Sequence, residues 1–411
     1  MTRFQHYLSY GSTDQVTARD LRKLYDGLLV PGTVAAFQAD GTKGFVLTLS
    51  ASTESKNYII DPRFPLFQNS LATPKRSHQD LADVVFEDPE LIHRSDSPQP
   101  SNFSKERCQK LAERWIDFNM GYTSVSSKHF QKYAERLGQD VFPSKSRLPT
   151  LILAPYFMSA SKDDPWWATS KELFDFSYQT AKDRGEAQRL RRVIAAAHPS
   201  ALPNLIDDIP DKNAAVWVND LSEINSTVDD LVAYGKGIRH AHEQGRGLFA
   251  LYGGYFSVVL GRFGLLGSSH GIGYGEHRQW VELRSTGPAP ARYYVRRLHR
   301  YVSIELASYL WQHARHLIDP PGTEPPSRDP LSLSNEYHDL MKHSVECRKL
   351  EIDVCGTQNP TDISTELRTT ANDYETTLET LAVPGTLRNR AVDSYSHLTR
   401  WADAIDRIAA A

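Results

Sequence analysis

Cysteine is scarce in this chain. Only Cys108, Cys347 and Cys355 occur among 411 residues, and none of them forms a CxxC pair. An odd and widely spaced set does not fit a disulfide framework, a zinc ribbon or an iron–sulfur cluster. Cys108 falls on the apolar stripe of a predicted helix, where a free thiol packs as a small hydrophobic side chain. We therefore expect ordinary apolar packing, rather than cross-links, to hold the fold together.

Long apolar runs are missing as well. No stretch approaches the roughly 18 apolar residues of a membrane-spanning helix, and the opening MTRFQHYLSYGSTDQ lacks the apolar core of a secretory signal. The formal net charge is only −3, so no field of the whole molecule attracts nucleic acid or an anionic membrane. These features predict a cytoplasmic protein without a membrane partner.

Familiar cofactor and metal signatures are also absent. No GxGxxG follows the first predicted strand, and no glycine-rich loop ends in the lysine and hydroxyl residue of a P-loop. The HExxH spelling of zinc-dependent proteases does not occur either. The sequence therefore predicts no cofactor. A divalent metal held by scattered histidines and carboxylates is the alternative that this reasoning leaves open.

Glycine, by contrast, is concentrated in one region. Ten of the 24 glycines lie between residues 245 and 275, where short apolar runs end in small and then polar residues. Glycine costs backbone entropy and is typical of sharp turns and of close approach to another group. Polar groups that follow short strands are also where α/β proteins build their sites. This region is therefore a candidate working face.

Short apolar runs alternate with amphipathic stretches along most of the chain, which is typical of parallel βαβ units. The number of runs and the length of the domain favour a (β/α)8 TIM-barrel-like fold, irregular at its start, where a helix between the early strands is missing. An open doubly wound parallel sheet is the alternative. The predicted strands are residues 33–38, 44–50, 58–61, 148–158, 192–197, 214–218, 248–251, 265–266 and 292–295.

Proline interrupts the chain after this region. Residues 319–330 read DPPGTEPPSRDP, which is typical of a semi-rigid linker. Residues 334–411 are helical in pattern, with breaks at 356–360 and 383–385. We therefore expect three parts: an α/β barrel-like domain over residues 1–318, a linker over 319–333, and a C-terminal helical extension over 334–411.

Polar side chains follow several predicted strands, and the strand ends of a parallel barrel collect at one rim. Carboxylates and histidines gathered there would suffice for general acid–base catalysis. The structural alternative for each is a helix cap or a buried group that merely satisfies the backbone. The candidate catalytic residues are Asp61, His198, Asp220, His270 and Glu276. Ser268 and Ser269 directly precede His270, and neighbours on a strand point to opposite faces, which argues against a serine nucleophile.

Other polar groups near these positions are candidate substrate-binding residues. Arg63 can fork onto a carboxylate or phosphate, or pair with a neighbouring acid to fix the turn after Asp61. Gly253 and Gly254 precede a predicted helix, so their backbone N–H groups can cradle an anion, or the glycines can simply allow close packing. The full set is Arg63, Tyr156, Gly253, Gly254, Tyr255, Tyr274 and Arg278.

Basic residues cluster twice, at Arg189, Arg191 and Arg192 and in the run RYYVRRLHRY at 292–301. Contact with phosphate or nucleic acid is one interpretation. The favoured interpretation is a solvated edge or the neutralisation of nearby acids, because the chain as a whole is slightly negative. Nucleic acid is therefore not the favoured partner.

These patterns favour an enzyme, a hydrolase or transferase. The predicted chemistry is acid/base hydrolysis or group transfer on a small anionic substrate that carries a phosphate or carboxylate, with a nucleotide or nucleobase included in that class. The alternative is a non-catalytic scaffold or interaction subunit of a bacterial multi-protein system, linked to nucleic acid. In that hypothesis residues 334–411 would bind a partner protein or a second copy of the chain.

Overall fold

The computed structural model describes most of the chain. The described residues are 3–11, 14–52, 56–69, 75–86, 97–125, 127–136, 138, 146–219, 221–272, 276–280, 291–322, 324–333 and 337–411.

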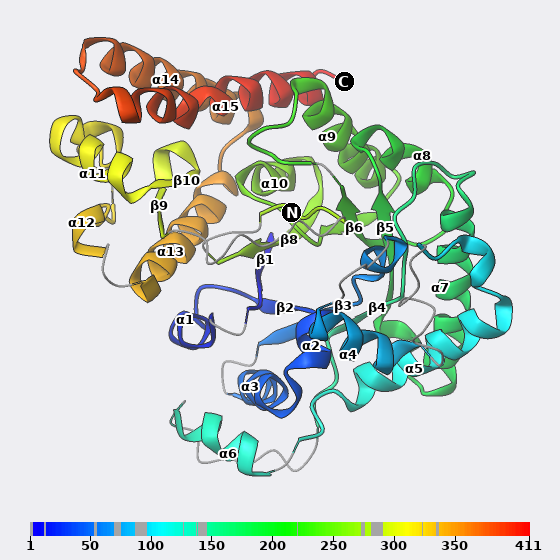
Figure 1. Ribbon diagram of the computed structural model, residues 1–411. Helices are drawn as coiled ribbons and strands as arrows, with labels where there is room; N and C mark the ends of the chain where they lie inside the picture. Colours follow the sequence, from blue (N-terminus) through cyan, green and yellow to red (C-terminus); the bar gives the residue numbers. More distant parts are fainter. Residues whose placement is uncertain are drawn as a thin grey trace.

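Eight parallel strands close into a barrel (Figure 1). Each strand pairs with the next along the chain, and the barrel closes where β1 pairs with β8, with Tyr7 opposite Ser269. The (β/α)8 prediction is confirmed, and the closure excludes the open sheet. The strands are β1 (Gln5–Ser9), β2 (Gly27–Pro31), β3 (Asn57–Asp61), β4 (Leu151–Leu153), β5 (Leu190–Ala196), β6 (Asn213–Val218), β7 (Gly247–Ala250) and β8 (Leu265–Gly271).

Helices surround these strands (Figure 1). They are α1 (Gln15–Asp20), α2 (Gly32–Phe37), α3 (Ala39–Ala51), α4 (Arg76–Val85), α5 (Lys105–Gly121), α6 (Ser127–Arg136), α7 (Pro165–Asp183), α8 (Leu202–Asp207), α9 (Val228–Glu243) and α10 (Tyr255–Leu260). After the barrel come β9 (Arg292–Val295), β10 (Arg300–Ser303), α11 (Ile304–His313), α12 (Pro330–Leu333), α13 (Tyr337–Cys355), α14 (Pro360–Thr380) and α15 (Gly385–Ala409). Within the described residues, no helix is both long and apolar enough to cross a membrane.

Alternation along the strands fills the barrel. Tyr7, Leu29, Ile59, Leu153, Val193, Ala215 and Phe249 belong to one buried cluster to which seven of the strands contribute, so this cluster is the interior. Gly27 has to be small because a Cβ there would lie 2.4 Å from a ring carbon of Tyr7. The same alternation carries Asp61, two residues beyond Ile59, to the inner face at the end of β3.

The early part of the barrel differs from the sequence prediction. Residues 33–38 and 44–50 were predicted as strands, but residues 33–37 lie in α2 and residues 44–50 lie in α3. In α3 the buried residues Phe45, Val46 and Leu49 recur at helical spacing. A stretch this short does not distinguish the helical repeat of 3.6 residues from the strand repeat of two. The strand β1 was missed because the buried polar residues His6 and Ser9 interrupt its apolar pattern. The strand β2 was missed although its five residues are all apolar and buried.

Two later strands are also shorter or placed differently than predicted. Only Leu151–Leu153 of the predicted strand at 148–158 is extended in the sheet. The strand at 292–295 is β9, which pairs antiparallel with β10 in a separate hairpin outside the barrel.

The C-terminal helices α13, α14 and α15 begin and end as the breaks in the sequence predict. α14 and α15 lie side by side, and α15 packs on α9 of the barrel (Figure 1). Buried residues of these helices and of the barrel form one continuous hydrophobic cluster, which includes Val216, Leu248, Leu367 and Trp401. Gly235 on α9 allows close approach, because a Cβ there would lie 2.1 Å from Cδ1 of Ile408.

Replacing Trp401 with alanine tests how much this packing contributes. Its side chain is 1% exposed, and its indole N–H donates to the carbonyl oxygen of Glu223 over 2.6 Å. We expect Trp401→Ala to lower the free energy of unfolding by about 3–5 kcal/mol, measured by chemical denaturation. Arg407→Ala on the same helix removes only an exposed ion pair with Asp229 and should cost under about 1 kcal/mol. Equal, small losses in both variants would contradict a stabilising role for α15.

Candidate functional site

Asp61 lies at the centre of a polar cluster at the carboxyl-end rim of the barrel. It is the last residue of β3, and Pro62 then ends the strand. Arg63 has a left-handed backbone, with φ 56°, which turns its N–H back to donate to Oδ1 of Asp61 over 3.1 Å. A non-glycine residue in this conformation costs on the order of 1 kcal/mol and often marks a functional turn. The carboxylate itself has no exposed surface.

Two phenols complete the surroundings of this carboxylate. The hydroxyl of Tyr156, which follows β4, donates to Oδ1 of Asp61 over 2.7 Å. The hydroxyl of Tyr252, which follows β7, donates to Oδ2. Burial, and then the negative charge of Asp61, raises the pKa of both phenols far above their usual value. Both therefore stay protonated at neutral pH and act as donors.

Two arginines, Arg63 and Arg278, lie beside Asp61 and the two phenols. The guanidinium of Arg278 lies 5.5 Å from the ring centroid of Tyr252. Burial, and then the positive charge of Arg63, lowers the pKa of Arg278, although an arginine starts so high that it remains charged. Among the described residues, Nε of Arg278 is buried and has no hydrogen-bond partner. Arg63 and Arg278 are half-buried, so the cluster meets solvent through its cations.

Aromatic residues wall the cluster and fix the segment that carries Arg278. The indole of Trp217, at the end of β6, packs edge-on against Tyr156 and Tyr252 with centroid distances of 6.2 and 5.6 Å. Its N–H donates to the carbonyl oxygen of Arg278 over 3.1 Å. Trp280 packs on the same interior cluster, and its backbone N–H donates to the side chain of Asn219 over 3.0 Å. Residues 276–280, the rim segment, therefore lie across the mouth of the barrel.

A second buried polar cluster connects the rim segment to the helical extension. Arg348 on α13 donates to Oε1 of Glu276 over 2.5 Å and pairs with Glu351 at 3.0 Å. Glu351 also accepts hydrogen bonds from Tyr294 and His299. Glu223 lies close to Glu276, because a Cβ on Gly254 would be 2.7 Å from one carboxylate and 2.8 Å from the other.

Two carboxylates of this cluster, Glu276 and Glu351, contact the guanidinium of Arg348, and Glu223 is within reach of its charge. Burial raises the pKa of Glu276 to about 7. The positive charge of Arg348 lowers this pKa, and the negative charges of Glu223 and Glu351 raise it, so the rise caused by burial persists. Burial also raises the pKa of Glu223. Carboxylates outnumber guanidiniums among the described residues of this cluster, and this imbalance favours the protonated form of Glu276.

The glycine pair at 253–254 does not present free N–H groups to a ligand. The start of α10 is bound by the carboxylate of Glu223, which accepts from the N–H groups of Phe256 and Ser257 over 2.9 and 3.0 Å. The N–H of Gly253 donates to Ser269. Tyr255 stacks on His299, with the ring centroids 3.5 Å apart, and so faces the extension. The structure thus places Gly253, Gly254 and Tyr255 beside the Arg348 cluster, apart from Asp61.

The two candidate histidines do not join Asp61. His270 alternates with the inward-facing Ser269, so it points outward, and its Nδ1–H donates to the carbonyl oxygen of Gly253 over 2.7 Å. Burial lowers the pKa of His270 well below its usual value, and it packs against His6 at 4.9 Å. His198 is exposed after β5. Asp220 and Tyr274 lie outside the described residues.

Residues 267–271 spell GSSHG, which matches the GxSxG of a nucleophile elbow at Ser269. The structure does not support that reading, because Ser269 lies within β8 and its hydroxyl donates to the carbonyl oxygen of Leu251. A serine nucleophile would need a sharp turn and an exposed hydroxyl at this position. Ser269 has neither, since it is fully buried.

The sequence predicted four members of the Asp61 cluster: Asp61, Arg63, Tyr156 and Arg278. It did not select Trp217, Asn219 or Trp280, nor Glu223 and Arg348 of the neighbouring cluster. Asn219 directly follows β6, so the strand-end criterion could have found it. Arg348 carries no such signal, because it lies within a helix far along the chain.

The cations of the two basic stretches are largely paired within the chain. Arg297 pairs with Asp373, Arg300 with Asp393 and Arg192 with Asp211. This agrees with the interpretation that they neutralise nearby acids.

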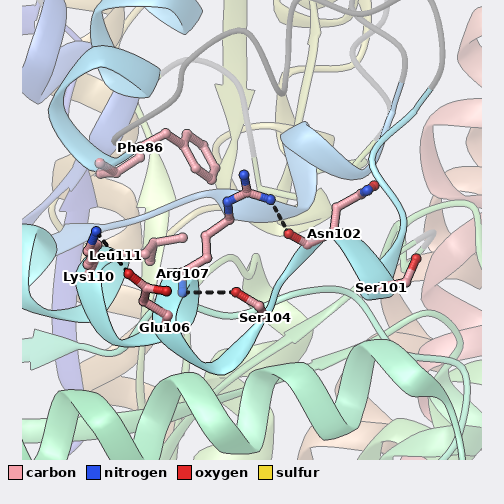
Figure 2. Close-up of a pocket in the computed structure, with 9 residues that line it drawn as sticks. Phe86, Ser101, Asn102, Ser104, Glu106, Arg107, Lys110 and Leu111 are labelled. Atoms are coloured by element: carbon pink, nitrogen blue, oxygen red, sulfur yellow. Dashed lines mark hydrogen bonds and ion pairs between the residues drawn. The ribbon is translucent and has the colours of Figure 1, made fainter.

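One of the largest cavities lies away from the Asp61 cluster. A cavity of about 380 Å³ opens between the end of α4 and the start of α5 (Figure 2). Figure 2 shows its polar side chains bonded to their own neighbours: Arg107 donates to the carbonyl oxygen of Asn102, and Lys110 pairs with Glu106 at 3.2 Å. We place the candidate site at Asp61 because charged and hydrogen-bonding groups converge there, whereas the volume of a cavity does not by itself indicate a reaction.

Within the described residues, no group of three or more histidine, cysteine or acidic residues is arranged to hold a metal ion.

The raised pKa of Glu276 predicts a pH dependence of stability. Its usual pKa is 4.5, so between about pH 4.5 and 7 the folded protein binds a proton that the unfolded chain releases, and stability falls as pH rises. We expect the free energy of unfolding of the wild type, minus that of Glu276→Gln, to fall by on the order of 1–3 kcal/mol between about pH 5 and 8. Chemical denaturation at each pH measures it. A difference that does not change with pH would contradict the assignment.

No protein-family model matches this chain. A search of curated proteins likewise finds no match. Among solved structures, the crystal structure of a candidate fructose-1,6-biphosphate aldolase from Coccidioides immitis aligns with a TM-score of 0.33 and 8% identity, over 86% of this chain and 91% of that chain. A likeness this weak carries no inference about activity, and the barrel itself rests on the strand pairing described above.

Proposed function

We propose that this protein is a barrel enzyme that binds a small anionic substrate at the carboxyl-end mouth of the barrel and acts on it by acid–base chemistry at Asp61. The observation that carries the proposal is the guanidinium of Arg278, whose buried Nε has no hydrogen-bond partner among the described residues. A buried donor on a charged group costs about 1–3 kcal/mol when unsatisfied. A ligand oxygen would satisfy it.

The charges at the mouth support an anion as that ligand. Arg63 and Arg278 are close enough that each disfavours the charge of the other, and Asp61 is the carboxylate among the described residues that offsets this effect at Arg278. Glu276, on the same rim segment, is bonded to Arg348 instead. Two neighbouring guanidiniums favour an anion, and a phosphate or carboxylate would accept charge-assisted hydrogen bonds from Arg278 and interact favourably with the charge of Arg63.

Asp61 and the two phenols supply groups for proton transfer. Asp61 would accept a proton from the substrate on one carboxylate oxygen. That step releases the phenol bonded to the same oxygen, so Tyr156 or Tyr252 can turn its O–H to the substrate oxygen on which negative charge develops. The phenols thus take the donor role that the sequence suggested for His198 or His270. Hydrolysis and group transfer are both consistent with this set.

Replacing Arg278 tests the anion site. We expect Arg278→Gln to raise the Kd for inorganic phosphate at least about tenfold, because a charge-assisted hydrogen bond contributes about 1.5–3 kcal/mol. Isothermal titration calorimetry measures the affinity, with a small dicarboxylate and a nucleoside monophosphate as further probes.

Arg407→Gln is the matched control, because its guanidinium pairs with Asp229 at the exposed surface of α15. It should leave every affinity unchanged. If wild type and Arg278→Gln bind all three anions equally, or neither binds any, the proposed site is wrong.

Replacing Asp61 separates binding from chemistry. Asp61→Asn removes the negative charge that competes for the two guanidiniums, so phosphate affinity should rise several-fold. Turnover of any substrate found by screening phosphorylated and carboxylated compounds should fall by about 10²–10⁴. A variant that melts like wild type but turns over normally would rule out Asp61 as the base.

A further inference from the structure

We propose that helix α13 of the C-terminal extension completes the barrel site: Arg348 is a positioning residue that, through Glu276, sets where Arg278 stands over the mouth. This inference rests on the proposed function, because it assigns Arg348 a part in the same anion site. Arg348 itself touches neither Asp61 nor the place of the ligand. It acts on the rim segment.

Arg348 is built as a fixed anchor. Its side chain is 4% exposed and lies between two carboxylates: Nη2 donates to Glu276, and Nη1 forms an ion pair with Glu351 at 3.0 Å without a hydrogen bond. Its guanidinium also lies 5.3 Å from the ring centroid of Tyr294, whose hydroxyl donates to Glu351. Glu351 therefore holds Arg348 from the side of the extension, and the remaining arm of the guanidinium holds Glu276.

Few other hydrogen bonds among the described residues attach the rim segment to the molecule. Trp217 donates to the backbone oxygen of Arg278, and Asn219 accepts from the backbone N–H of Trp280. The side chain of Asn69 donates to the backbone oxygen of Trp280 over 3.3 Å. These contacts come from the barrel and hold backbone atoms. The contact of Glu276 with Arg348 comes from outside the barrel and is the one ion pair on the segment among the described residues.

This arrangement fixes Arg278 from two directions. Glu276 lies two residues before Arg278, so the ion pair determines the path by which the backbone reaches the mouth. Because Nε of Arg278 has no hydrogen-bond partner among the described residues, the placement of the guanidinium depends on that backbone path as well as on its contact with the ring of Tyr252. A displacement of about 1 Å at a binding group costs a large part of its contribution.

The opposing interpretation is that Arg348 only neutralises three buried carboxylates. That role predicts a loss of stability without a specific effect on the anion site. The positioning role predicts that removal of the Glu276 side chain loosens the rim segment and weakens anion binding while the fold persists. Glu276→Ala is suitable because Arg348 keeps Glu351 as a partner and Glu223 loses a repelling neighbour.

The experiment uses the full chain and inorganic phosphate. In Glu276→Ala we expect amide hydrogen exchange over residues 276–280 to be at least about tenfold faster and the Kd for phosphate to rise at least about fivefold. Glu276→Gln keeps an acceptor oxygen for Arg348, so its amide exchange rate and its Kd for phosphate should both be close to those of the wild type. Arg348→Met should reproduce the effects of Glu276→Ala, and Lys349→Ala, which removes only the neighbouring pair with Asp353, should change neither.

The outcomes separate this inference from the proposed function. If Arg278→Gln weakens phosphate binding but Glu276→Ala changes neither exchange nor affinity, Arg348 is structural and the inference is wrong. If Glu276→Ala accelerates exchange at 276–280 but leaves affinity unchanged, the contact orders the segment without positioning Arg278, and the inference is again wrong. If no anion binds the wild type, the proposed function fails, while the exchange measurement still reports whether α13 holds the rim segment.

Discussion

Burial of the Asp61 carboxylate is the constraint on which the rim of this barrel depends. An ionised carboxylate removed from water is costly unless donors replace its hydration. Here the donors come from the turn after β3, from Tyr156 after β4 and from Tyr252 after β7. Strands on different sides of the barrel are therefore tied to one pair of oxygen atoms. The position of the phenols, and with it the packing of Trp217 between them, follows from that requirement.

A second charge cluster joins the barrel to the helices that follow it. Glu223 and Glu276 come from barrel loops, Glu351 and Arg348 come from α13, and all four are largely buried. Such a cluster is a poor source of net stability, because the cost of dehydrating the ions offsets much of their attraction. It is, however, specific in geometry, because a guanidinium satisfies several acceptors only in a fixed arrangement. The ion pair of Arg348 with Glu276 thus aligns the extension with the rim segment, and apolar packing, as at Trp401, stabilises its attachment to the barrel.

Much of this could be predicted from the sequence, for physical reasons. The strand ending in Asp61-Pro62 combines an apolar run with a proline that stops the strand, so its carboxylate is expected at the strand end, where the structure has it. Tyr156 was selected because it follows a predicted strand in the same way, Arg63 because it follows Asp61-Pro62, and Arg278 because it follows the glycine-rich region. The helices of the extension were located by proline and glycine breaks, which act locally. These features depend on residues that are adjacent in the chain, and such local patterns can be recognised from the sequence alone.

The remaining features depend on contacts between distant segments. His270 follows an apolar run as Asp61 does, yet it points outward, because a single step along a strand reverses the face. The inner or outer choice was fixed by the pairing of β8 with β1, a strand that the polar residues His6 and Ser9 concealed. Arg348 lies on a helix more than 70 residues beyond the last barrel strand, so only the folded chain shows that it meets Glu276.

The carboxylate of Glu223 at the start of α10 has one more consequence. Barrels commonly hold phosphate groups with main-chain amides near the last strands, where the site is built into the backbone. In this chain the amides at the start of α10 are already bound by its own glutamate, so the anion site proposed above is made of side chains. A site made of side chains is altered by single substitutions without rebuilding the scaffold. Related barrels that share this internal cap would be free to diverge in the anions they select while keeping the same main-chain path.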